Sequence, residues 1–260
     1  MKKQTKLFEK QFLKARDAIE RKGVSMAKKA IASQYAAFIE RTKTTDFRQW
    51  LQVIDSSVND RPINQFFEQY YPMSAKLAVM VRKNMLKGKA SEEDKIMENA
   101  FSFKLTKIVR DEAGSKITSI TNTTRERIES VVRGILDEAD TEGWGVPEIT
   151  SNLYRELKNN LVGNGYARAR AIAQTEIISA SNQASQFAAD STGYEYRKFW
   201  STSGLPNIRA THLEAEQFSE NKDGLRPDEP FPNGLQYPGD PNGSAEEVIN
   251  CRCTIMHEII

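Results

Sequence analysis

Cysteine and histidine are scarce in this chain, which has 260 residues but only two of each. Two cysteines cannot form the disulfide framework of a small secreted domain. Because Cys251 and Cys253 are separated by one residue, a bond between them would close a small, strained ring, and we expect both thiols to be reduced. Two histidines are also few for an enzyme that relies on general acid–base catalysis.

Long apolar runs and nucleotide-binding motifs are absent as well. No stretch approaches the ~20 apolar residues that cross a bilayer, so the sequence predicts no membrane segment. The basic N-terminus leads into a charged amphipathic stretch, where a signal peptide would have an apolar core; this predicts folding in a cytoplasm. There is no P-loop, dinucleotide-binding fingerprint or nucleophile elbow. We therefore expect a protein that is not an enzyme.

Charge is distributed unevenly along the chain, although the net value is only +2. Residues 1–50 hold 13 Lys and Arg against 5 Asp and Glu, whereas residues 221–260 hold 3 against 7. The first turns are especially basic: Lys2, Lys3, Lys6, Lys10 and Lys14. Such an arm predicts contact with nucleic acid or an acidic protein surface. The alternative is that these lysines form the solvated face of an amphipathic helix.

Apolar residues at helical spacing predict one helix after another over about the first 190 residues. Asp46 is expected to cap one helix, and Pro72 to end another before Ser74 caps the next. Five further boundaries are expected: a helix start at Ser91, a break at Gly114, a start at Thr124, and glycine turns at 143–145 and 163–165.

The pattern changes after Gly193. Residues 194–200 alternate and are aromatic, which predicts a strand that pairs with residues 251–256. A segment rich in Pro and Gly separates the two. The predicted fold is therefore mainly α, with an elongated N-terminal α-helical region followed by a small α+β C-terminal domain. We place the boundary between 1–115 and 116–260, with helices to about 190 and the α+β module at 191–260.

A metal site is the first chemical hypothesis. Thiols at i and i+2 of an extended segment point to one face, so Cys251 and Cys253 can reach the same ion. His212 would add a third ligand, and His257 or a carboxylate a fourth, which suits tetrahedral zinc. A structural zinc would add on the order of 10 kcal/mol of folding energy to a loop-rich segment. The alternative is that the two thiols are a surface and a core side chain of an edge strand.

Other pairings of the same residues give weaker hypotheses. Cys251 with His212 has the composition of a thiol-protease dyad. His212 with Glu214 or Glu216 has that of a metal-dependent hydrolase or nuclease.

Ala169, Ile172, Ala173 and Glu176 share one face of the helix expected in this part of the chain. Glu176 is expected either to pair with Arg209 or Arg252, in a fork that would link the two halves of the chain, or to form a solvated pair within its helix.

Seven short motifs occur in one order over about residues 120–256. They are Gly143-Trp144-Gly145, Ile172-Ala173-Gln174-Thr175-Glu176, Phe199-Trp200, Arg209-Ala210-Thr211-His212, Phe231-Pro232-Asn233-Gly234, Pro238-Gly239-Asp240-Pro241 and Ile249-Asn250-Cys251-Arg252-Cys253. In this order the chain resembles the minor head, or head morphogenesis, proteins of tailed bacteriophages, the group typified by the F protein of phage Mu. Gln174 stands where that family usually has Arg, and Leu205-Pro206-Asn207 lacks the family's Asp.

The resemblance implies a low-copy virion protein, a minor capsid protein that joins the procapsid in the host cytoplasm and stays in the phage head, inside it or at the portal vertex. It implies binding to the portal protein and to major capsid or scaffold protein, and a role in packaging or ejecting DNA. The motif residues would then hold a docking module together: Glu176, Trp200, Arg209, Asn250 and Arg252, with His212, Cys251 and Cys253. A DNA-binding virion protein, with the basic N-terminal helices on the genome, is the alternative.

Overall fold

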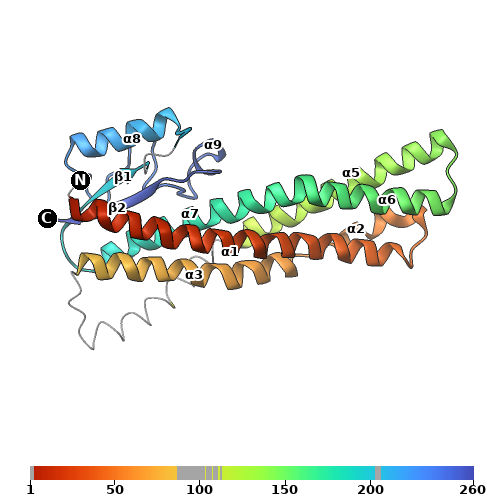
Figure 1. The fold of residues 1–260 in the computed structure, drawn as a ribbon, viewed down its shortest axis with the longest axis horizontal. Coiled ribbons are helices and arrows are strands. Elements are labelled where there is room, and N and C mark those ends of the chain that lie inside the picture. Colours follow the sequence, from red (N-terminus) through yellow and green to blue (C-terminus); the bar gives the residue numbers. More distant parts are fainter. Residues whose placement is uncertain (1–2, 87–102, 104–106, 108–110, 112, 203–205) are drawn as a thin grey trace. The chain divides into compact units, whose positions relative to one another are not determined.

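The computed structural model describes residues 3–86, 103, 107, 111, 113–202 and 206–260. The predicted class is confirmed: the fold is mainly α, with a long N-terminal helical region and a small C-terminal part that holds two antiparallel strands (Figure 1). The helices are α1 Lys3–Thr42, η1 Phe47–Val53, α2 Ile54–Ser57, α3 Arg61–Met85, α5 Ala113–Glu142, α6 Val146–Asn160, η2 Leu161–Gly165, α7 Tyr166–Asp190, α8 Ala210–Asn221 and α9 Ala245–Val248. The helix expected to start at Ser91 lies outside the described residues.

The chain forms two compact units, each assembled from separate segments. The first unit comprises Met1–Gly23, Tyr70–Val109 and Ala171–Ile260. The second unit comprises Val24–Gln69 and Arg110–Arg170. This division differs from the sequence-based boundary at residue 115, because contacts between segments far apart in the sequence define the units.

The helix break expected at Pro72 does not occur. Helix α3 continues through Pro72, and the Ser74 hydroxyl donates to the carbonyl of Tyr71 rather than capping a new helix. Leu77 and Ala78 are fully buried one to two turns later. Burial of this continuing apolar face offsets the roughly 3 kcal/mol that an interior proline costs a helix.

Glycine is also a weaker helix breaker here than the sequence suggests. Helix α5 starts at Ala113, next to the break expected at Gly114, and it runs through Thr124, where a new helix was expected to start. Residues 163–165 do not open a new helix either, since they belong to a π-helical turn, η2, that joins α6 directly to α7. The Asp46 cap is present, because its carboxylate accepts the amide of Arg48 at the start of η1.

The second unit contains a core of regularly spaced apolar side chains. Helix α5 buries Ile128, Val132 and Ile135, and helix α6, which packs against it, buries Leu153 and Leu157. These positions recur every three or four residues, so each helix presents one apolar stripe to the other. The Glu148 side chain caps the start of α6 through the amide of Gly145, at 3.0 Å.

The two strands of the first unit form the small sheet that the sequence predicts. Strand β1, Tyr196–Ser201, pairs antiparallel with β2, Thr254–Ile259, and α8 lies next to β1 (Figure 1). Both strands start later than expected, so the pairing involves residues 254–259 rather than 251–256. Cys251 and Cys253 consequently lie in the turn before β2, where they are free of ladder hydrogen bonds.

Candidate metal centre

A left-handed turn at Asn250 directs the cysteine segment into the first unit. Asn250 has a φ of 58°, which Asn tolerates better than most residues. Its amide donates to the Thr175 hydroxyl at 3.2 Å, and its carbonyl accepts the Gln174 side chain at 3.1 Å. Helix α7 therefore holds both sides of the turn, and the next residue, Cys251, is 1% exposed.

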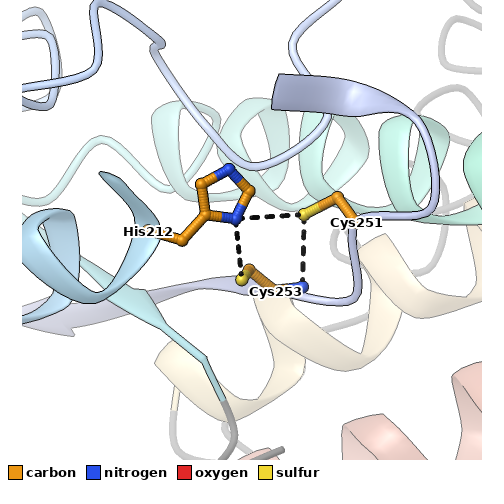
Figure 2. A group of neighbouring side chains, drawn as sticks. All are labelled: His212, Cys251 and Cys253. Atoms are coloured by element: carbon orange, nitrogen blue, oxygen red, sulfur yellow. Dashed lines mark hydrogen bonds between the residues drawn. The ribbon is translucent and has the colours of Figure 1, made fainter. Parts of the chain in front are cut away.

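His212, Cys251 and Cys253 converge in the interior of this unit. Their ligand atoms lie within 4.8 Å of one another, and all three residues are buried. Nδ1 of His212 is 3.8 Å from the Cys251 sulfur and 3.4 Å from the Cys253 sulfur (Figure 2). His212 comes from α8, and both thiols come from the turn before β2, so the three side chains approach one point from two directions.

The spacing of these atoms fits a metal ion. With Zn–S near 2.3 Å and Zn–N near 2.0 Å, a tetrahedral ion separates nitrogen from sulfur by about 3.5 Å. The two Nδ1–sulfur distances, 3.4 and 3.8 Å, bracket that value. The Cys253 amide also donates to the Cys251 sulfur at 3.4 Å. Such a donor stabilises the negative charge of a thiolate that binds a metal. The cluster can therefore hold a metal ion.

Glu247 fixes the orientation of the histidine. Its carboxylate lies 2.9 Å from Nε2 of His212, on the side of the ring away from the thiols. A proton on Nε2 leaves the Nδ1 lone pair facing the two sulfurs, which is the tautomer a metal ligand needs. Thr211 donates to the same carboxylate at 3.0 Å. Glu247 was not anticipated, because its role depends on contact with α8 and not on its place in the sequence.

Trp200 closes the site from β1. Its ring packs edge to face against the rings of His212 and Phe231, with ring centroids 4.9 and 5.1 Å apart. The indole N–H is buried and has no hydrogen-bond partner of normal geometry among the described residues. Trp200 lowers the pKa of the Cys253 thiol, against the larger raising effects of Cys251 and of burial.

The two thiols shift each other's pKa in opposite directions. The hydrogen bond from Cys253 lowers the pKa of Cys251, and the His212 ring acts in the same direction against the effect of burial. The hydrogen bond to Cys251, followed by burial, raises the pKa of Cys253. A divalent cation bound between the two sulfurs would allow both to ionise.

Arg16 of α1 supports the cysteine turn from the other side, and sequence patterns did not reveal it. It is 1% exposed, and its guanidinium donates to the carbonyls of Cys253 at 3.4 Å and Arg252 at 3.1 Å. Burial lowers the pKa of Arg16 below its usual value. A buried arginine with carbonyl acceptors fixes the backbone of the ligand turn.

Asn182 of α7 also holds the ligand segment. Its amide group donates to the carbonyls of Pro238 at 2.9 Å and Cys253 at 3.1 Å. Its carbonyl oxygen accepts the amide of Ile255 at 3.0 Å. Gly239 lets the loop approach α7 closely: its φ is 76°, and a Cβ there would lie 3.1 Å from the backbone of Ser179. One helix therefore joins the Pro-Gly-Asp-Pro loop to the cysteine turn.

Other predicted site residues lie elsewhere. His257 is on β2, where its ring meets that of Tyr196 at 5.3 Å and lies 3.4 Å from the Gln186 side chain. It does not join the cluster, because it lies four residues beyond Cys253, and a strand that rises about 3.3 Å per residue carries it roughly 13 Å away. Glu176 is buried and accepts a hydrogen bond from Tyr71 at 2.9 Å.

The two arginines expected to pair with Glu176 have other partners. Arg209 donates to the carbonyl of Ile249 at 2.6 Å. Arg252 lies 3.3 Å from Glu20 and 3.5 Å from Asp17, both on α1. These arginines therefore tie the ends of the ligand segment to the rest of the first unit.

The carboxylates expected to serve a catalytic centre do not belong to the ligand group of His212, Cys251 and Cys253. Glu214 is exposed on α8. Glu216 accepts the amide of Thr202 at 2.9 Å and its hydroxyl at 2.7 Å. Within the basic arm, Lys6, Lys10 and Lys14 are exposed on α1, whereas Lys2 and the Lys3 side chain lie outside the described part of the chain.

Comparisons with protein-family models, curated proteins and solved structures found no match for this chain. Among the described residues, none of the helices is long and apolar enough to cross a membrane.

Proposed function

We propose that this chain is a minor head protein of a tailed bacteriophage, acting in head morphogenesis as a structural component and not as an enzyme. The proposal rests on the motif order given above, in which the Ile-Asn-Cys-Arg-Cys ending after a Pro-Gly-Asp-Pro loop is the most specific element. In this role the protein joins the procapsid in the host cytoplasm and stays in the virion, in the head interior or at the portal vertex.

The observation that carries the proposal is the use of the motif residues. Asn182 links the Pro-Gly-Asp-Pro loop to the cysteine turn through the carbonyls of Pro238 and Cys253. Trp200 and His212 pack edge to face behind that turn. Residues of separate motifs are therefore held together by shared contacts. Such contacts make a module rigid, as a docking module needs to be.

We also propose that the metal of this module is zinc. His212, Cys251 and Cys253 would hold it, Glu247 would orient the histidine, and the Trp200 N–H would act on the Cys253 sulfur. Zinc supplies a cross-link between α8 and the turn before β2, and it needs no redox chemistry to do so. A segment with short helices and two strands gains stability from such a link.

The partners implied by this function are the portal protein and the major capsid or scaffold protein. Packaged DNA is a further partner if the protein acts in packaging or ejection. A protein at the portal vertex is expected in few copies, since a head has a single such vertex.

DNA binding is the second candidate function. Lys6, Lys10 and Lys14 are exposed and recur every four residues, so they form one basic stripe on α1. Contacts from such a stripe to phosphates would be independent of sequence and weakened by salt. Replacing the three lysines by Gln should then abolish retention of duplex DNA at low salt; unchanged retention would remove this candidate.

The head-assembly proposal is tested by co-expressing the chain with the portal and major capsid proteins of one phage genome. Co-purification with portal or procapsids at low copy number supports it. Absence from both preparations, with the chain soluble and folded, would overturn it. A chain with Asn182→Ala, which breaks the module without touching its exposed surface, should lose this association and serves as the matched comparison.

A further inference from the structure

A cavity of about 230 Å³ adjoins the candidate metal centre. Two of the three converging residues, His212 and Cys253, form part of its wall, whereas Cys251 does not. The rest of the wall includes the polar side chains of Thr202, Arg209, Asn250 and Arg252 beside the apolar ones of Pro206 and Ile208. The ligand cluster therefore has one side that faces an open space.

The described residues supply three metal ligands and no fourth. Of their histidines, cysteines and carboxylates, only His212, Cys251 and Cys253 form such a group. Glu247 lies on the Nε2 side of His212, away from the thiols, and His257 contacts Tyr196. Zinc takes four ligands, and a site with three protein ligands keeps its fourth position for water or a ligand from outside.

The charge of the cavity wall selects the kind of ligand. A divalent ion bound by two thiolates and a neutral imidazole has no net charge. The two arginines therefore make the cavity wall positive. Arg209 donates to a backbone carbonyl and has no carboxylate partner among the described residues. Arg252 is 3.3 Å or more from its two carboxylates, and its Nε is buried and has no hydrogen-bond partner in the part of the chain that the structure describes. Guanidinium groups of this kind bind carboxylates with two parallel hydrogen bonds.

We propose that the fourth position of the metal opens into this cavity and takes a carboxylate from outside the described residues, held by Arg209 and Arg252. This inference rests on the metal centre of the proposed function. The carboxylate belongs either to a small acid or to an acidic group of a partner protein, and both present the same two oxygens to the ion and the arginines.

The test uses the full chain loaded with cobalt in place of zinc, because the visible bands of cobalt report its ligands. Titration with acetate should shift these bands until the site saturates. Arg209→Gln should raise the acetate dissociation constant about tenfold, the effect of losing one charged hydrogen-bond partner. Arg226→Gln is the matched control, since Arg226 is exposed and 3.9 Å from its carboxylate partner Asp228, and it should leave the constant unchanged.

The outcomes separate this inference from the function on which it rests. Cobalt bands that acetate does not alter would overturn the open position while leaving the metal centre in place. Absence of cobalt bands would overturn the metal centre itself. If acetate acts, purified portal protein is added in acetate-free buffer: the same band shift assigns the carboxylate to the partner, and no shift assigns it to a small acid.

Discussion

The second unit and the C-terminal segment from residue 196 onward bury different kinds of side chain. In the second unit, α5 and α6 bury mainly apolar residues at helical spacing, such as Val132 and Leu153. The C-terminal segment buries Lys198, His212 and Asp240, with exposed fractions of 0%, 1% and 3%. Apolar burial is gained in proportion to area, whereas a buried polar group is stable only if its partner is present. The C-terminal segment should therefore be more sensitive to single losses.

Removing the metal ligands should have the largest effect. In a Cys251→Ser, Cys253→Ser variant, amides of residues 249–259 should lose about a thousandfold of hydrogen-exchange protection, because the cross-link to α8 is gone. Amides of Val132 and Leu153 should change by less than about tenfold. Chelation of the unchanged protein should give the same pattern and zinc should reverse it. Equal losses of protection in both regions would show that the metal ligands do not stabilise the C-terminal segment in particular.

Lys198 tests whether one buried polar group matters as much as a core residue. Its ammonium donates to the Pro227 carbonyl at 2.9 Å and to both oxygens of Gln236, at 2.9 and 3.1 Å. Lys198→Met should lower the free energy of unfolding by about 2–4 kcal/mol, measured by urea denaturation, because three acceptors lose their donor. Lys222→Met removes an exposed ion pair with Glu229 and should cost less than about 1 kcal/mol. Similar losses of unfolding free energy for both variants would show that the buried Lys198 contributes no more than an exposed lysine.

Two glycines separate backbone strain from close packing. Gly239 and Gly234 have similar φ values, 76° and 80°, but a Cβ at Gly234 would meet nothing within 4 Å. Gly234→Ala should cost about 1 kcal/mol through strain alone, and Gly239→Ala about 2–3 kcal/mol, since its methyl group also presses on α7. Thermal denaturation of the two variants measures the difference. Equal values would mean that the loop does not need its close approach to α7.

His257 makes the C-terminal segment sensitive to acid. Burial, with a smaller contribution from Lys198, lowers the pKa of His257 from 6.5 to about 3. Between these values the unfolded chain binds a proton that the folded chain does not, so stability present above pH 6.5 is lost as the pH falls. From pH 7 to 4.5 the unchanged protein should lose about 2–3 kcal/mol more than His257→Gln. Parallel losses in urea denaturation at both pH values would contradict this assignment.

The smallest effect is expected in the second unit. Gly134 is exposed within α5, and a Cβ there would meet no neighbour within 4 Å. Gly134→Ala should raise the free energy of unfolding by about 0.5–1 kcal/mol, because Ala loses less backbone entropy in a helix. A loss of stability in urea denaturation would show that this helix face has contacts beyond those of the described residues.

Sequence patterns predicted the two regions unequally. Helical spacing predicted the mainly helical first 190 residues, to which α5 and α6 belong, because an apolar stripe is a local property. The helix end at Pro72 and the helix start at Thr124 were wrong, since local propensity was outweighed by burial along the whole helix. His212, Cys251 and Cys253 were anticipated from their chemistry and scarcity. Arg16, Asn182 and Glu247 were not, because each acts through contacts with distant segments that no local pattern records.

Metal content of the purified full chain is the most direct measurement of the central claim, that an ion held by His212, Cys251 and Cys253 organises the C-terminal segment. Native mass spectrometry combined with elemental analysis, on protein prepared without chelators, should find about one zinc per chain. The Cys251→Ser, Cys253→Ser variant should carry none. Fewer than about 0.2 zinc per chain in the unchanged, folded protein would contradict the account.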